Sequence, residues 1–341
     1  MRTILFVNHA KKNCGVYQYG ARIFEVIKLL PGYQFDYLEA SQLQDLLDQV
    51  KIASYDAIIY NYFYFTLPFI DPKEVKKYAA CLHICLAHEI PHTQIASLTQ
   101  DTFDYYLYAD PTSPDNPYLF KIGRLLPKCH AQPAENNQKL TVGSYGFAGE
   151  LKGFDILVKL IQDEFDEAII RINIPPNNMV DNKVVAAQII ERCKNQVQKP
   201  GICLEITQEF LDENQLLDFL ASNTINIFPY YDKTKSLVGI ASAPDFAIAA
   251  GRPMAVSDCY MFRHLHDIRP SITIPVKAFS KIRLFLEQIK SFFSLRQPAY
   301  RSIKAIIRDE GRALEEKKKV WSEAAFLHQF DTILSEIFER I

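Results

Sequence analysis

Short apolar runs alternate with amphipathic stretches along this chain. In its first third, residues 3–7, 56–62, 81–87 and 105–108 are almost continuously apolar, a pattern typical of strands buried on both faces of a parallel sheet. Residues 16–30 instead repeat their apolar side chains at helical spacing, with Ile23, Val26, Ile27 and Leu30 on one face. The pattern predicts alternating strands and helices, and therefore an α/β fold.

The same alternation starts again after a polar, proline-bearing stretch at 127–138, which we interpret as a linker. The pattern after it predicts strands at 140–145, 168–174, 202–206, 225–228 and 254–256. It predicts helices at 154–165, 183–198, 212–222, 243–250, 279–293, 298–313 and 321–341. We therefore expect two tandem Rossmann-like domains, at 1–130 and 139–320, with a site in the cleft between the carboxyl ends of both sheets.

The stretch 236–257, SLVGIASAPDFAIAAGRPMAVS, is the most informative segment. Its small residues would let the backbone approach a ligand closely, and the free N–H groups of the following helix would attract an anion. Ser242 is expected to cap that helix, with Asp245 three residues on completing a capping box. Gly251 and Pro253 are expected to end it. An ordinary buried helix–strand unit would look similar.

Composition narrows the functional classes. The net charge of −2 over 341 residues gives no basic field for nucleic acid. The seven cysteines are odd in number and lack zinc-site spacing, so we expect free thiols in a reducing cytoplasm. His88 and His92 lie four residues apart, but Pro91 breaks any helix that would align them, and we expect no metal site. The chain shows neither a signal peptide nor an apolar run of membrane-spanning length, which favours a cytoplasmic location.

Several motifs are missing. No G-x-G-x-x-G follows the first strand, and no G-x-x-x-x-G-K-[ST] or G-x-S-x-G occurs. Enzymes that use nicotinamide dinucleotides, P-loop NTPases and hydrolases with a nucleophile elbow are therefore disfavoured.

Four segments carry a resemblance to a known family. They are the loop 8–20 with Gly15-Val16-Tyr17, the segment 142–153 ending in Lys152-Gly153, the stretch 226–257 with Ala249-x-Gly251-x-Pro253, and the helix from about Trp321. In order and spacing the chain resembles the GT-B glycosyltransferases, in particular family 4-like enzymes. The resemblance implies a nucleotide-sugar substrate, such as a UDP- or GDP-sugar, no cofactor, and a C-terminal helix, 321–341, that returns to complete the first domain.

The resemblance also implies a set of site residues. Lys152 would stabilise the departing diphosphate, which carries about two negative charges; His88 and Glu89 would orient the sugar or the acceptor. The expected donor-binding residues are Gly15, Val16, Gly146, Gly149, Lys152, Thr207, Gln208, Pro229, Tyr230, Ser236, Gly239, Ile240 and Ser242. Each has a plainer interpretation, as a solvated lysine, a tight turn or a histidine that ends a strand.

The chain departs from the family at three positions. The family's paired glutamates correspond to Val238 and Phe246, and the arginine that precedes the Lys-Gly pair corresponds to Phe147. These departures leave open whether the transfer retains or inverts the anomeric configuration, and whether it takes place. The alternatives are a nucleotide-sugar epimerase, a catalytically silent donor-binding subunit, and a periplasmic-type binding protein, which the missing signal peptide disfavours.

The expected acceptor is a glycan, a lipid-linked sugar or another hydroxyl compound, in bacterial surface polysaccharide or glycoconjugate synthesis. Contact with a membrane surface through Lys73, Lys76 and Lys77, or through 317–319, is a further expectation; such charge runs are more often solvated faces.

Overall fold

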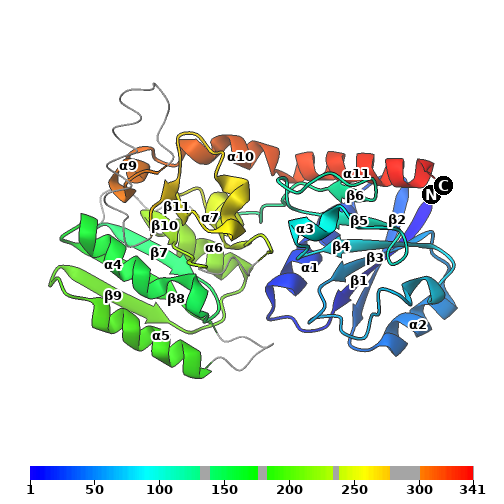
Figure 1. Cartoon of the computed structure of the whole chain (residues 1–341), viewed down its shortest axis with the longest axis horizontal. Coiled ribbons are helices and arrows are strands. Elements are labelled where there is room, and N and C mark those ends of the chain that lie inside the picture. The colour runs from blue at the N-terminus through cyan, green and yellow to red at the C-terminus, as the bar shows by residue number, and fades with distance from the viewer. Residues whose placement is uncertain (131–138, 176–182, 233–237, 277–299, 341) are drawn as a thin grey trace. The chain divides into compact units, whose positions relative to one another are not determined.

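The computed structural model describes residues 1–130, 139–175, 183–232, 238–276 and 300–340. They form two compact units (Figure 1). The first consists of Met1–Leu125, Val238–Ile240 and Val320–Ile341, and the second of Leu126–Leu237 and Ala241–Lys319. The predicted helix at 279–293 and the predicted site residue Ser236 lie outside the described residues.

The sheet of the first unit is parallel, and its central strands are the predicted apolar runs. Its strand order is β2 (Tyr33–Ala40), β1 (Arg2–His9), β3 (Ala57–Tyr62), β4 (Leu82–Ala87), β5 (Tyr105–Tyr108) and β6 (Leu119–Lys121). Its helices are α1 (Gly15–Ile27), α2 (Leu43–Ile52) and α3 (His92–Ile95), with a 3₁₀ turn η1 (Val75–Lys77). The pattern did not predict β2 or β6, because neither forms a long buried apolar run, and it also missed the amphipathic α2.

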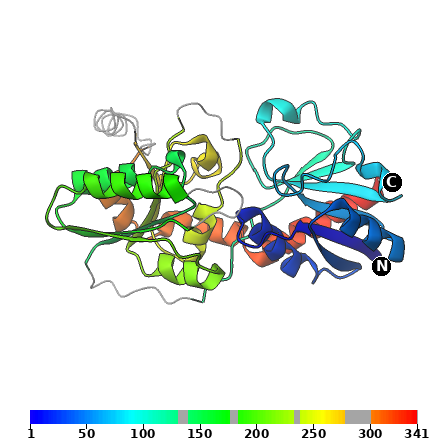
Figure 2. The same ribbon diagram turned by 90° about the horizontal axis from the view of Figure 1, so that it is seen from below.

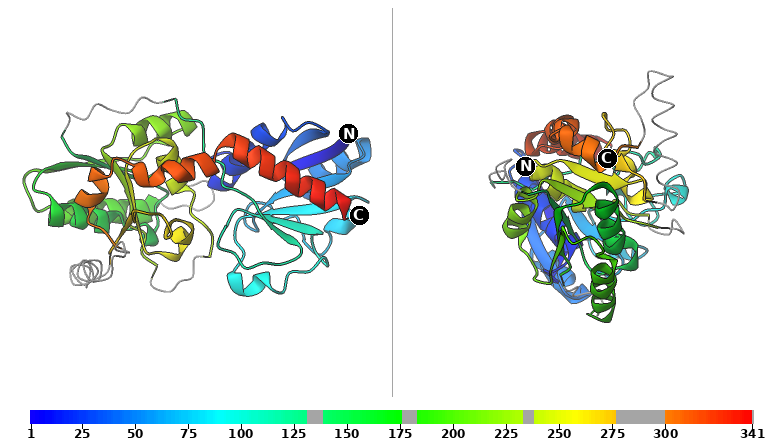
Figure 3. Two further views of the ribbon diagram at one scale, coloured as in Figure 1. Left: turned by 90° about the horizontal axis from the view of Figure 1, so that it is seen from above. Right: turned by 90° about the vertical axis from the view of Figure 1, so that its left-hand side faces the viewer.

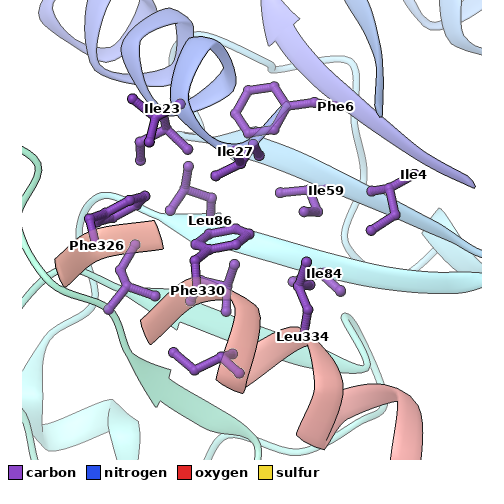
Figure 4. Packing of buried hydrophobic residues seen from close by; sticks show 14 of the residues in the cluster. Ile4, Phe6, Ile23, Ile27, Ile59, Ile84, Leu86, Phe326, Phe330 and Leu334 are labelled. Carbon is purple, nitrogen blue, oxygen red and sulfur yellow. The ribbon is translucent and has the colours of Figure 1, made fainter. Parts of the chain in front are cut away.

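The C-terminal helix α11 (Glu323–Glu339) belongs to the core of this first unit. Its Phe326, Phe330 and Leu334 are buried against α1 and the sheet, where Ile23 and Ile84 lie (Figure 4). Viewed from above, α11 runs across the strands of the unit (Figure 3). The predicted return of this helix to the first domain is therefore observed.

The sheet of the second unit is also parallel. Its order is β12 (Thr273–Ile274), β11 (Met254–Ser257), β10 (Ile225–Phe228), β7 (Thr141–Tyr145), β8 (Ala168–Asn173) and β9 (Ile202–Thr207). One face packs against α4 (Phe154–Glu164), α5 (Lys183–Gln196) and α9 (Ile303–Arg308). The other packs against α6 (Glu213–Ala221) and α7 (Ala243–Ala249), so that α4 and α6 lie on opposite sides (Figure 2).

Two helix predictions in this unit need correction. The predicted helix at 298–313 is the shorter α9, because Glu310 and Gly311 have positive φ, of 52° and 80°, and break the helix before η4 (Arg312–Leu314) and α10 (Glu315–Val320). The capping box at Ser242 is absent, because the backbone of Ser242 is already helical and its side chain makes no capping bond. The predicted end of α7 is observed, with Gly251 at a φ of 74°.

Both sheets have a topological switch point, where neighbouring strands continue into helices on opposite faces. It lies between β1 and β3 in the first unit and between β7 and β10 in the second, whose order is that of a Rossmann fold. In open parallel sheets, ligands bind at the carboxyl ends of the strands beside this point. The residues that follow β1, β3, β7 and β10 are therefore candidate site residues.

None of the helices in the described ranges combines the length and the apolar character needed to cross a bilayer.

The turn from β7 into α4 depends on one glycine. Gly153 has a φ of 69°, and a Cβ atom there would lie 2.2 Å from the carbonyl oxygen of Pro229. Gly153→Ala should therefore lower the free energy of unfolding by about 2–4 kcal/mol, measured by urea denaturation.

The matched control lies four residues earlier. Gly149 has an extended backbone, with a φ of −165°, and its added Cβ would meet no atom closer than 3.8 Å. Gly149→Ala should change the stability by less than about 0.5 kcal/mol. Equal effects of the two substitutions would contradict this account of the turn.

Candidate functional site

In the first unit, buried polar side chains gather at the ends of β1 and β3, the strands that flank the switch point. Asn8, His9 and Asn61 are each 1% exposed or less. The Asn61 amide nitrogen donates to the Asn8 side-chain oxygen over 2.8 Å, and this bond links the two strand ends. Because an unpaired buried amide is costly, these side chains hold one another in place.

His88 follows β4 and joins this cluster. Its Nε2 lies 2.6 Å from the side-chain oxygen of Asn61, and its ring makes an edge contact with Tyr19 at 5.5 Å between centroids. Burial, followed by electrostatic repulsion from a protonated His9 and from Arg124, lowers the pKa of His88 to about 3. The ring is therefore neutral at pH 7 and a weak base, better suited to hydrogen bonding than to general-base catalysis.

His9 is the second neutral imidazole of the cluster. Its Nδ1 accepts from the backbone N–H of Lys11 over 3.2 Å, so its proton lies on Nε2. That Nε2 is buried and has no hydrogen-bond partner among the described residues. Burial is the main cause that lowers the pKa of His9 to about 4, and Lys11 adds to it.

The remaining predicted residues of the first unit lie around this cluster. Gly15 is exposed at the start of α1, and the carbonyl of Val16 accepts from Asn61 over 2.8 Å. Glu89 is largely exposed, yet partial burial raises the pKa of its carboxyl group. Gly239 belongs to this unit with Ile240, and a Cβ atom on it would lie 2.9 Å from Cγ of Glu89. These contacts join Val16 to Asn61 and bring Gly239 against Glu89.

In the second unit the structure brings Lys152 and Tyr230 together at the switch point. Lys152 ends the 3₁₀ turn η2 (Glu150–Lys152) after β7, and Tyr230 follows β10. Nζ of Lys152 donates to the Tyr230 hydroxyl over 2.8 Å and lies 4.1 Å from the ring centroid. The face of the ring attracts the ammonium group, and the hydrogen bond restricts its position.

Glycines and backbone bonds build the floor of this second cluster. Gly146 has a φ of 149°, and an added Cβ would lie 3.6 Å from Lys152 and 3.7 Å from the Tyr230 hydroxyl. A Cβ atom added at Gly149, just before η2, would meet Cγ of Lys152 at 3.8 Å. The hydroxyl of Ser257 donates to the backbone carbonyl of Tyr230 over 2.6 Å, and this bond fixes the backbone after Pro229. The predicted residues Gly146, Gly149, Lys152, Pro229 and Tyr230 therefore form one local arrangement.

Thr207 and Gln208 lie further along the sheet, at the end of the edge strand β9. The hydroxyl of Thr207 accepts from Asn173 over 2.9 Å, and the carbonyl of Asn173 accepts from the backbone of Gly146 over 3.1 Å. Thr207 is thus connected to the Lys152 cluster through Asn173. Gln208 instead lines a groove between α5 and β9, with Lys194, Leu204 and Ile206 among its neighbours.

Ser242 precedes α7, which contains only seven residues. Pro244 occupies its first turn and has no N–H group, so this helix offers an anion fewer donors than the sequence suggested. Phe246, which stands at a family glutamate position, is buried against α6 and makes an edge contact with Tyr145. Its role in this structure is packing.

The sequence reasoning missed three side chains that organise these clusters, Asn8, Asn61 and Asn173. Each is a buried asparagine in the last residues of a mainly apolar strand. A buried amide in such a strand needs hydrogen-bond partners, so an asparagine at the end of an apolar strand could have indicated a polar cluster there. Within the described ranges no group of three or more His, Cys, Asp or Glu side chains could hold a metal ion.

The buried neutral His9 makes a prediction about acid stability. An unfolded histidine binds a proton near pH 6.5, whereas folded His9 does so only near pH 4, so the unfolded state takes up protons first as the pH falls. The free energy of unfolding of the wild-type protein should therefore decrease from pH 6.5 to pH 4. His9→Asn should reduce this dependence, measured by urea denaturation at several pH values.

The control is His328→Asn, which alters an exposed histidine of α11. It should leave the pH dependence as in the wild type. A His9→Asn protein with the full wild-type slope would show that His9 titrates normally in the folded state.

Searches by sequence give no relative, since no protein-family model matches the chain and no curated protein sequence matches it either. Comparison of structures does find similar folds. HepE of Anabaena, in complex with UDP and glucose, has a TM-score of 0.67 at 10% identity, over 98% of this chain and 100% of HepE. The lipopolysaccharide outer core galactosyltransferase WaaB gives 0.60 at 9% identity, over 100% of both chains.

A third similar structure is a UDP-forming α,α-trehalose-phosphate synthase from Burkholderia xenovorans, with a TM-score of 0.58 at 10% identity, over 96% of this chain and 98% of the synthase. At sequence identities near 10%, structural similarity shows a common fold and does not by itself show a common activity. With its two parallel six-stranded sheets and its C-terminal helix, this chain has the two-domain fold of the GT-B glycosyltransferases.

Proposed function

We propose that this protein is a glycosyltransferase that moves a sugar from a nucleotide-sugar donor to a hydroxyl group of an acceptor, without an essential metal ion. The observation that carries the proposal is the position of Lys152, held over Tyr230 where β7 and β10 end beside the switch point. A transferase that breaks a sugar–diphosphate bond needs a fixed positive charge at the leaving group.

The second unit has the features of a donor site. Lys152 supplies the charge, and Gly146 and Gly149 let backbone N–H groups approach phosphate oxygens. Since HepE binds UDP and UDP-glucose, we take a uridine diphosphate sugar as the first donor to test. In this proposal Thr207 and the residues around Ser242 contribute further polar contacts to the donor.

The first unit has the features of a hydroxyl-binding site. His88 is neutral and too weak a base to take a proton from a hydroxyl at pH 7, so its role is to orient the transferred sugar or the acceptor. The departing phosphate then takes the acceptor proton. The acceptor we propose is a glycan or a lipid-linked sugar, of the kind that the name of WaaB describes.

One observation favours a second function, a silent donor-binding subunit. Phe246 occupies a position where the resembled family carries a glutamate. Its side chain is buried between α6 and α7, so this position supplies no carboxylate to a donor. A protein of this kind would bind the donor and release no product. Measuring binding and turnover on the same preparation separates the two functions.

Donor binding should appear as ligand-dependent stability. At a concentration one hundred times its Kd, a nucleoside diphosphate adds about 2.7 kcal/mol to the free energy of unfolding. UDP should raise the Tm in a thermal-shift assay by more than GDP, ADP or CDP at the same concentration. If all four leave the Tm unchanged, the donor site is wrong.

Lys152→Met should lower the rate of sugar transfer about 10²–10³-fold and reduce the UDP-induced rise in Tm, because it removes the charge that faces the diphosphate. In the absence of ligand the variant should lose about 1 kcal/mol or less, the cation–π contact with Tyr230. The rate is measured as release of UDP from UDP-glucose in the presence of a glycan acceptor.

The matched control is Lys159→Met. Lys159 lies on α4 in the same unit, where it is exposed and pairs with Asp163 over 3.5 Å. This variant should transfer sugar and bind UDP like the wild type. A Lys152→Met enzyme with wild-type turnover would remove Lys152 from the mechanism.

A further inference from the structure

Asn61 holds its side-chain amide in one orientation. Its nitrogen donates to the backbone carbonyl of Val16 over 2.8 Å and to the side-chain oxygen of Asn8 over 2.8 Å. A carbonyl oxygen can only accept, so the nitrogen of Asn61 must lie on that side. Its oxygen therefore faces His88, at 2.6 Å from Nε2.

Asn8 is fixed in the same way by backbone groups. Its oxygen accepts from the backbone N–H of His9 over 2.9 Å, and its nitrogen donates to the carbonyl of Tyr17 over 3.0 Å. Reversing either amide would set donor against donor or acceptor against acceptor at these bonds. The two amides thus form a relay, Asn8–Asn61, whose polarity the backbone sets.

The polarity of this relay determines the tautomer of His88. The oxygen of Asn61 can only accept, so Nε2 of His88 must carry the proton, and in a neutral ring Nδ1 is then the acceptor. No further hydrogen bond from this ring occurs within the described residues, and the edge of Tyr19 packs against it. Nδ1 therefore has a lone pair available for a donor from a ligand.

The space for this relay depends on a glycine of α1. A Cβ atom at Gly20 would lie 2.2 Å from the amide nitrogen of Asn61, so any other residue would displace the amide. At Gly20, therefore, α1 packs directly on the amide that contacts His88. The helix and the two strand ends form one packed support for the imidazole.

We propose that Asn61 is a positioning residue: it fixes His88 as the Nε2–H tautomer, so that Nδ1 accepts a hydrogen bond from a hydroxyl group of the transferred sugar or of the acceptor. This role rests on the proposed function for the identity of the hydroxyl, but the tautomer itself does not depend on it. The charged or titratable groups that face His88 are His9 from β1, Arg124 after β6 and Tyr19 from α1.

The first experiment reads the tautomer directly on the wild-type protein. In long-range ¹H–¹⁵N spectra of the protein labelled with ¹⁵N-histidine, the pair of ring nitrogen shifts distinguishes the Nε2–H, Nδ1–H and charged forms. His88→Gln assigns the signals. We expect the neutral Nε2–H form at pH 7. A neutral Nδ1–H ring or a charged ring would overturn the proposal.

The second experiment changes the oxygen that faces the ring. Asn61→Asp keeps an acceptor and adds a negative charge, which should raise the pKa of His88 by roughly one to three pH units and move the acid limb of the transfer rate to higher pH. Asn61→Leu has a similar shape but no acceptor, and it should allow the Nδ1–H form to appear. Asn195→Asp, at an exposed position of α5, is the control and should change neither readout.

The outcomes distinguish a failure of the positioning role of Asn61 from a failure of the proposed transferase function. If Asn61→Leu keeps the pure Nε2–H form, or if Asn61→Asp leaves the pH profile of transfer unchanged, the positioning role is wrong while the transferase remains. If the wild type transfers no sugar from any nucleotide donor, the proposed function is wrong, and the nitrogen shifts alone decide whether Asn61 fixes the tautomer.

Discussion

The parallel pairing of one strand with two neighbours is the constraint on which both units depend. β1 pairs with β2 and β3, and β7 pairs with β8 and β10. Because the helices that follow such strands pack on opposite faces, the strand ends between them remain open to a ligand. The polar side chains described above stand at these ends, and their positions follow from the order of the strands rather than from proximity in sequence.

The two units furnish this opening with different chemistry. The first uses a network of neutral groups, in which two amides bond to each other, to the backbone and to an imidazole. The second uses a single ammonium group above a phenol ring, with glycines around it. A neutral network suits a hydroxyl group, whereas a fixed cation suits a phosphate.

Most of the fold could be predicted from the sequence, because central parallel strands are long apolar runs and helices repeat their apolar residues. The edge strand β2 was not predicted, because Tyr33–Ala40 mixes polar and apolar residues and only its last residue, Ala40, is fully buried. Of the candidate site, Lys152 and His88 could be located by motif and by position after a strand. Asn61 could not, because its partners Asn8 and Val16 lie about fifty residues away and only the folded sheet brings them together.

The packing of α11 on the first unit has a consequence for biosynthesis. The ribosome makes β1 to β6 early. Residues 126–319 are then made before α11, the helix that covers one apolar face of the β1–β6 sheet. During that interval α1 is already made, but Ile84 and the neighbouring side chains of the sheet lack the cover of α11. The unit that is translated first is therefore completed last. Until α11 is made, its apolar surface is exposed to chaperone binding and to aggregation.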